Sequence, residues 1–337
     1  MIRSVPRPKC YLCDRPGTFL YEGLIDRLFQ AQGKWNIRRC TNPECGLLWL
    51  DPFPVDSDLG EAYESYYSHE DAPKHAGSRA SITARLRWFV KFGYFASDDH
   101  QPPQAGVLPK CLKRAACLAF PPLISYLPLE SKGTLLDVGC GDGDLIQAMQ
   151  DYGWNVAGVD PDPAAVQFAC RRGLDVRLGS LMDQRYRSCS FDAIILNHVI
   201  EHVPDPILVL KECHRILKPE GRLIMATPNV GGWFHRKFRQ NWVHLDPPRH
   251  LFLFRMGTLV ELVRRSGFNK PLQCFTELGA PFVYRASELI RRNGKFTVRA
   301  GAPLGTNLKA GLMNLAELVR LRAGRDVGEE LRLITDK

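Results

Sequence analysis

Three glycines alternate with other residues directly after an apolar run, at positions 139, 141 and 143. Glycine lets the backbone turn sharply and approach a ligand closely, because no Cβ stands in the way. An acidic residue, Asp160, ends the next apolar run, where its carboxylate can accept hydrogen bonds from both hydroxyls of a ribose. This pattern is typical of the nucleotide-binding turn of a doubly wound α/β protein.

The charge around this turn distinguishes two classes of cofactor. A dinucleotide site has glycines in the pattern G-x-G-x-x-G, whereas here the third position of that pattern is Asp144. Asp137 precedes the first glycine by two residues, and its carboxylate would repel a pyrophosphate. The same carboxylate would attract an ammonium group, such as the one on the methionine end of S-adenosylmethionine. The sequence therefore predicts S-adenosylmethionine as the cofactor.

Four cysteines near the N-terminus form two closely spaced pairs. They are Cys10, Cys13, Cys40 and Cys45. Each pair can curl around one side of a tetrahedral zinc ion, and Gly17 and Gly46 suit the turns; four ordinary cysteines or two disulfides are the alternatives. No apolar run follows the basic N-terminus, so we expect no signal peptide and a reducing cytoplasm, where metal is favoured over disulfides. Four thiolates leave no open coordination position, so the predicted zinc is structural.

Short apolar runs alternate with helical patterns from residue 134 onward, and this alternation is typical of a parallel sheet with helices on both faces. The helix expected at 163–172 has Asp162 as its N-cap and Pro163 at its first position. The other helices are expected at 144–152, 207–217 and 256–266, and arginine-rich amphipathic helices at 281–322. The expected strands cover 134–138, 154–159, 174–178, 191–197, 222–227, 272–276 and 329–335.

A family resemblance is carried by four segments, LLDVGCGDG, VAGVDPD, FDAIILNHVIEHVPDP and LKPEGRLIMATPN. Residues 130–277 resemble a class I S-adenosylmethionine-dependent methyltransferase, most closely the branch that acts on quinone-type and sugar-type small molecules. The resemblance implies an α/β fold with a doubly wound, seven-stranded Rossmann-like sheet whose last strand runs antiparallel. It also implies that Asn197 and His198 lie near the methionine part of the cofactor. The predicted cofactor-binding residues are Asp137, Gly139, Cys140, Gly141, Asp160, Pro161, Asn197 and His198.

The chain departs from this family after the third strand. Many relatives carry an acid there, which contacts the adenine amino group. Here the stretch is Gly179-Ser180-Leu181, so we expect a serine or a backbone group to make this contact.

Methyl transfer needs an aligned nucleophile and, for many acceptors, a base that removes a proton. Histidine is the usual base because it titrates near neutrality. His202 follows the fourth strand, where active sites of open α/β sheets lie, and His250 belongs to a cluster with His244 after the fifth strand. We predict His202 and His250 as catalytic, with a structural, hydrogen-bonded histidine as the alternative. Arg249 is expected either to hold an anionic substrate or to pin the following helix.

The predicted domains are a zinc ribbon at 1–55, a helical linker covering the pocket at 56–129, and a methyltransferase domain at 130–337 with a helical insertion at 281–325. The ribbon resembles the N-terminal module of bacterial sugar C-methyltransferases, in which an aromatic helix follows. Here that helix would carry Tyr63, Tyr66 and Tyr67. We expect the third, C-terminal domain of those enzymes to be missing.

The sequence thus predicts a methyltransferase acting on a small-molecule or carbohydrate-type (glycan) acceptor, for example in surface polysaccharide synthesis. The alternatives are an RNA methyltransferase whose ribbon binds RNA, a quinone-type O-methyltransferase, and a binding module that has lost its chemistry. The net charge of +9 permits RNA, but the bases of the ribbon are spread out, so nucleic acid is the less favoured partner. The bases of 74–114 and 285–325 indicate either solvated helix faces or contact with a partner, which would be a membrane surface (peripheral membrane contact) or an anionic glycan. No apolar run is long enough to predict a membrane-spanning helix, and the sequence indicates no oligomeric state.

Overall fold

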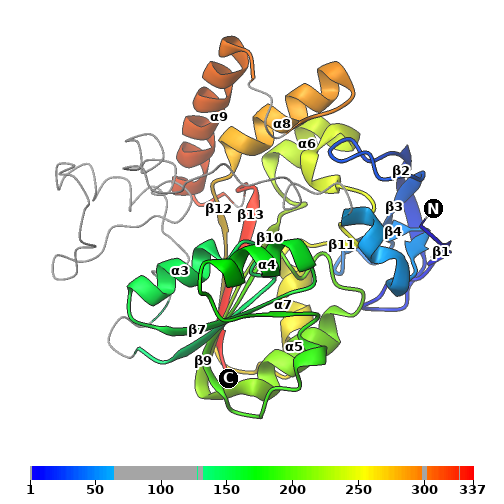
Figure 1. Cartoon of the computed structure of the whole chain (residues 1–337). Helices are drawn as coiled ribbons and strands as arrows, with labels where there is room; N and C mark the ends of the chain where they lie inside the picture. Colours follow the sequence, from blue (N-terminus) through cyan, green and yellow to red (C-terminus); the bar gives the residue numbers. More distant parts are fainter. Residues whose placement is uncertain (1, 64–126, 128–131, 298–301, 326) are drawn as a thin grey trace. The chain divides into compact units, whose positions relative to one another are not determined.

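Seven strands form the main sheet, in the order β12-β13-β10-β9-β6-β7-β8 (Figure 1). The strands β6 to β9 pair in parallel, whereas β12 and β13 pair antiparallel. The α/β fold with a seven-stranded sheet and an antiparallel last strand, predicted from the sequence, is therefore confirmed. The computed structural model describes residues 2–63, 127, 132–297, 302–325 and 327–337. The strands of this sheet are β6 (Thr134–Val138), β7 (Asn155–Asp160), β8 (Val176–Leu178), β9 (Phe191–Asn197), β10 (Leu217–Pro228), β12 (Leu272–Glu277) and β13 (Glu330–Asp336).

The helices follow the predicted alternation with the strands. In β9 four successive apolar residues, 193–196, are buried, as expected of a strand that is covered on both faces. The helix after β7 begins as predicted, because the carboxylate of Asp162 accepts the N–H of Ala164 at 2.9 Å and Pro163 occupies the first turn. The helices are α3 (Asp144–Asp151), α4 (Pro163–Arg171), α5 (Pro206–Ile216), α6 (Trp233–Phe238), α7 (Met256–Arg265), α8 (Ala280–Asn293) and α9 (Leu304–Arg322). Short 3₁₀ helices cover Asp56–Tyr63, Met182–Gln184, Arg239–Asn241 and Val243–Leu245.

A second, four-stranded sheet has the order β11-β4-β3-β2 and is antiparallel throughout. Its core contains the buried rings of Trp35 and Trp49. Gly17 is needed here by packing and not by a turn, because a Cβ at this position would lie 2.4 Å from the Trp49 ring. The strands are β2 (Gly17–Leu24), β3 (Trp35–Cys40), β4 (Leu48–Asp51) and β11 (Phe252–Leu253), and β1 (Ser4–Val5) pairs separately with β5 (Phe53–Pro54).

The chain divides into two compact units. The first comprises residues 1–69, 197–214 and 225–335, and it holds the four cysteines and the histidines at 198, 202, 244 and 250. The second comprises residues 70–196, 215–224 and 336–337, and it holds the glycine turn and Asp160. Most of the predicted linker at 56–129, with Tyr66 and Tyr67, lies outside the described residues. Among those that are described, no helix is both long and apolar enough to cross a bilayer.

Candidate functional site

The glycine turn follows β6 directly and has the backbone conformation that its sequence predicts. Gly139, Gly141 and Gly143 have φ angles of 70°, 55° and 79°, which are left-handed values that side chains with a Cβ rarely adopt. The N–H of Gly139 donates to the carbonyl of Val159 at 2.8 Å and fixes the turn against β7. Gly158 makes this approach feasible, because a Cβ there would lie 2.7 Å from the buried Cys140 sulfur.

Asp160 joins this turn to the start of the following helix. One carboxylate oxygen accepts the N–H of Gly141 at 2.8 Å, and the other accepts the N–H of Asp162 at 2.9 Å, across Pro161. An ionised carboxylate has about four acceptor sites, so these two bonds leave capacity for the hydroxyls of a ribose. The structure thus brings Asp160, Gly139, Cys140 and Gly141 together, as the sequence predicts for one nucleoside-binding turn.

Asp137 is a buried acid at the same turn. Burial, together with the negative charges of Asp160 and Asp142, raises the pKa of its carboxyl to about 8. No basic group bonds to it in the part of the chain that the structure describes. A ligand ammonium placed here would compensate for the burial of the charge. This site therefore fits the cationic amino-acid end of S-adenosylmethionine and does not fit a pyrophosphate.

The loop after β8 contains an acid that the sequence analysis missed. The backbone N–H and the hydroxyl of Ser180 both donate to Asp183, at 2.8 and 2.7 Å, and these bonds lower the pKa of that carboxyl. The N–H and the hydroxyl of Ser180 are therefore already hydrogen-bonded to Asp183. The signal was present in the sequence, three residues beyond Ser180, and Asp183 is the acid available in this loop for an adenine amino group.

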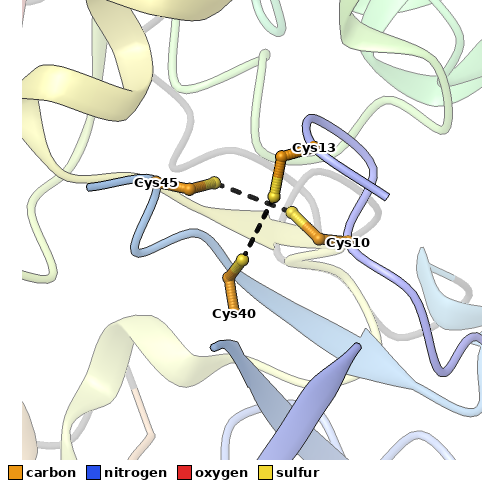
Figure 2. A group of neighbouring side chains, drawn as sticks. All are labelled: Cys10, Cys13, Cys40 and Cys45. Atoms are coloured by element: carbon orange, nitrogen blue, oxygen red, sulfur yellow. Dashed lines mark hydrogen bonds between the residues drawn. The ribbon is translucent and has the colours of Figure 1, made fainter. Parts of the chain in front are cut away.

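The four N-terminal cysteines point toward one another (Figure 2). The sulfurs of Cys10 and Cys45 are 3.7 Å apart, and those of Cys13 and Cys40 are 3.3 Å apart. Four sulfurs at about 2.3 Å from a tetrahedral zinc would be separated by about 3.8 Å, so the cluster fits such an ion after a small adjustment. The turns of the two knuckles place Asp14 and Gly46 at φ angles of 56° and 59°.

Helix α7 and the residue before it donate hydrogen bonds to the backbone near both cysteine pairs. Arg255 and Thr258 donate to the carbonyl of Cys45, and Arg265 donates to the carbonyl of Leu12. These contacts fix the carbonyls next to the thiols from outside the ribbon. The cysteine cluster is thus held by a helix that begins more than 200 residues later in the chain.

Four histidine rings gather elsewhere in the same unit, and the first of them is ion-paired. Asn197 is the exposed last residue of β9, and His198 follows it in a left-handed conformation. The ring of His198 lies between Glu201, at 3.1 Å, and Glu330, at 2.9 Å. Burial lowers the pKa of His198, but the Glu330 charge and the Glu201 hydrogen bond outweigh it and raise the pKa to about 10. His198 is therefore an imidazolium with both N–H groups already engaged.

His202 and His250 contact each other edge to face, with ring centroids 4.6 Å apart. The Nδ1 of His202 lies 3.1 Å from the carbonyl of Arg249, and the Nδ1 of His250 lies 2.7 Å from the carbonyl of His244. A carbonyl only accepts, so Nδ1 of His250 carries a proton, and in the neutral ring Nε2 has the free electron pair. Nδ1 of His202 also lies 2.9 Å from the Tyr63 hydroxyl, which can donate or accept, so these contacts are compatible with either tautomer of His202. Burial and the neighbouring His250 lower the pKa of His202 to about 4. His202 is thus a neutral imidazole, as a general base must be.

Glu201 lies beside this histidine pair. Its two oxygens accept from His198 and from the Thr227 hydroxyl, the latter at 3.0 Å. Burial raises the pKa of Glu201, but the hydrogen bond and charge of His198 together with the other two histidines outweigh it and lower the pKa to about 2. Ligand atoms of Glu201, His202 and His250 lie within 4.8 Å of one another, a distance that also suits a cation. Because both oxygens of Glu201 are already hydrogen-bonded, we interpret the group as an acid–base cluster.

Arg249 does not hold a substrate in this structure. Its side chain is fully buried and makes a two-pronged pair with Asp26, at 2.8 Å for each contact. It also donates to Asp246 and to the carbonyl of Ala62. All of these partners belong to the protein and none of them lies in the following helix α7, so Arg249 neither holds an anionic substrate here nor pins that helix.

Comparisons with known proteins agree on one kind of domain. The sequence profile of a family described as a methyltransferase domain matches residues 112–271. The ubiquinone biosynthesis O-methyltransferase of Xanthomonas oryzae pv. oryzae is 39% identical over 102 residues, which cover 28% of this chain and 43% of that protein. The protein of the same name from Xylella fastidiosa is 37% identical over 164 residues, covering 46% and 64%. This chain therefore spans less than two thirds of either relative's length.

Among solved structures, a SAM-dependent methyltransferase from Archaeoglobus fulgidus is similar to this chain with a TM-score of 0.44. It is 19% identical, and the match covers 68% of this chain and 95% of that chain.

The burial of Asp137 predicts that cofactor binding releases a proton. Without ligand the pKa of this carboxyl is about 8, so the carboxyl is mostly protonated at neutral pH. A bound ammonium favours the ionised form and lowers that pKa, so affinity for S-adenosylmethionine should rise between about pH 6 and pH 7. Titration calorimetry in two buffers of different ionisation enthalpy measures the released proton.

Asp137→Asn should abolish the proton release and weaken cofactor binding by about 10- to 100-fold, as for a lost charged hydrogen bond. Asp151→Asn, at an exposed acid of α3, is the matched control and should leave both quantities unchanged. Unaltered affinity in Asp137→Asn would show that the ammonium binds elsewhere.

Proposed function

Because residues 112–271 form a domain of the S-adenosylmethionine-dependent methyltransferase family, we propose that this chain transfers a methyl group to a hydroxyl of a small-molecule acceptor. The proposal rests on one turn, whose glycines have left-handed backbone angles. Before them lies the buried Asp137, to which no cation of the described residues is paired, and after them lies Asp160, the candidate ligand of the ribose. When bound, the cofactor supplies an electrophilic methyl group on a sulfonium. Asp137 would hold the ammonium, and Asp160 the ribose hydroxyls.

His202 and His250 are the proposed base. A hydroxyl that attacks a methyl group must lose its proton, and an Nε2 with a free electron pair can accept it. The carbonyl of His244 fixes the His250 ring through Nδ1, so this ring presents Nε2. His202 presents Nε2 in the tautomer whose Nδ1 donates to the carbonyl of Arg249 or to the Tyr63 oxygen. The ionised Glu201 would stabilise the imidazolium that forms. His198 is excluded from this role because it is already protonated and paired with two carboxylates.

Two classes of acceptor have support. The curated relatives are named for ubiquinone biosynthesis, and this favours a quinone-type phenolic hydroxyl. The cysteine cluster before the methyltransferase domain favours a carbohydrate-type acceptor, through the resemblance of the ribbon to sugar methyltransferases. We propose the quinone-type hydroxyl as the lead, because a phenol is acidic enough to lose its proton to a weakly basic imidazole.

The four cysteines are proposed to bind one structural zinc ion. The sulfur separations of 3.3 and 3.7 Å support this assignment, as do the hydrogen bonds that α7 and the residue before it donate to the cysteine loops. All four coordination positions would be filled, so the ion would stabilise the fold and take no part in methyl transfer.

Removing the histidine base should lower turnover without weakening cofactor binding. His202→Ala is expected to reduce kcat by about 100- to 10,000-fold, the usual contribution of a general base. Since the pKa of His202 is lowered to about 4, the wild type saturated with S-adenosylmethionine should keep its kcat down to about pH 5. His214→Gln, on α5, is the matched histidine control. Normal turnover in both His202→Ala and His250→Ala would eliminate these residues as the base.

Zinc content and thermal stability test the ribbon. The purified protein should carry one zinc per chain, and Cys40→Ser should lose it and melt more than about 5 °C lower, because metal binding contributes to folding. The same substitution at an exposed cysteine, Cys170→Ser, should change neither value. Zinc-free wild-type protein of full stability would contradict the assignment.

The acceptor class is decided by where the methyl group goes. Protein supplied with isotopically labelled S-adenosylmethionine and an extract of the source cells should label the lipid-soluble, quinone-containing fraction. The His202→Ala protein in the same extract is the control, and it should transfer little label. Label in glycan would favour the carbohydrate-type acceptor, and label in RNA would reject both small-molecule classes.

A further inference from the structure

Helix α9 carries a row of large apolar side chains that face solvent. Their exposed fractions lie between 56% and 86%. They are Leu304, Leu308, Leu312, Leu315 and Val319. With a rise of 1.5 Å per residue this row is about 22 Å long. A row of this length is far more than the scattered apolar residues of an ordinary protein surface.

The row lies opposite the side by which α9 packs on its own protein. The buried residues of the helix are Thr306, Ala310 and Glu317. At about 100° per residue, these three positions point about 180° away from the exposed row. Helix α8, which lies beside α9 (Figure 1), contacts the helix without covering the row. The apolar row is therefore not the edge of the internal core.

The surroundings of the row are strongly basic. In the described parts of α8, α9 and their flanks, residues 280–297 and 302–325, eight lysines or arginines stand against two glutamates, which gives a net charge of +6. Both glutamates are buried. Lys309, Arg322 and Arg325 are exposed on α9 or just after it.

We propose that α9 is a membrane-docking helix that inserts its apolar row into the interface of a bilayer containing anionic lipid. An amphipathic helix of this kind binds through apolar burial together with attraction between its bases and acidic headgroups. The main competing occupant is a second copy of this chain. Symmetric pairing would bring two surfaces of +6 against each other, and their repulsion opposes that arrangement.

Docking rests on the exposure and charge of α9, and it does not depend on the proposed methyl transfer. Vesicle binding and turnover can therefore fail separately. Should both hold, docking would bring a lipid-soluble acceptor to the enzyme.

Co-sedimentation of the full chain with vesicles tests the proposal. The protein should bind vesicles of phosphatidylcholine with phosphatidylglycerol, and at least tenfold less to phosphatidylcholine alone. Raised salt should weaken this binding, since salt screens charge attraction. The variant Leu308→Ser/Leu312→Ser/Leu315→Ser should bind the anionic vesicles at least tenfold more weakly. Lys309→Gln/Arg322→Gln should bind more weakly as well and lose part of the salt dependence.

A matched control removes three exposed apolar side chains elsewhere in the same unit. The variant Val5→Ser/Ile25→Ser/Leu208→Ser should bind vesicles like the wild type. Equal melting temperatures would establish that all variants are folded. Absence of vesicle binding by the wild type, equal binding to both vesicle types, or full binding by the α9 leucine variant would each overturn the proposal. A concentration-dependent dimer that the leucine variant abolishes, without vesicle binding, would assign the row to a second copy.

Discussion

The guanidinium of Arg249 is a full charge with no exposed surface, and the geometry of the histidine cluster depends on how it is neutralised. Asp26 and Asp246 bind it from two parts of the chain that are more than 200 residues apart. Asp26 also accepts the N–H groups of Leu28, Phe29 and Ala31, so its loop is fixed by the same carboxylate. Breaking such a network by removing one partner costs about 3–5 kcal/mol, because the remaining charges stay buried and unpaired.

This ion network also orients groups that can do chemistry. The carbonyl of Arg249 lies 3.1 Å from Nδ1 of His202, and the adjacent residue is His250. The carbonyl of Glu201, next to His202, accepts the N–H groups of Leu251 and Phe252, which extends the attachment into β11. The two rings are thus positioned by backbone groups that the salt bridge holds still. A structural arginine and a candidate base are parts of one arrangement, although the sequence suggested separate roles for them.

Local patterns in the sequence predict the elements around the glycine turn well, because strand, turn and cap are each determined by adjacent residues. The predicted strands at 134–138 and 191–197 match β6 and β9, and the cap at Asp162 has the expected geometry. The start of β10 was placed too late, since Pro219 and Glu220 look like a turn although the strand runs through them. The roles of Gly17 and Arg249 could not be predicted, because their partners, Trp49 and Asp26, are distant in sequence.

Partners that are distant in sequence also explain why the protonation state of each histidine could not be predicted from the sequence. His198 and His202 are four residues apart and both are partly buried, yet their pKa values move in opposite directions. The difference arises from Glu330, which lies 132 residues beyond His198 and pairs with it. Asp137 is the opposite case, a buried acid to which the described part of the chain offers no cation. Folding alone does not explain a buried carboxyl without a cationic partner, so the cation that would ionise it is best sought in a ligand.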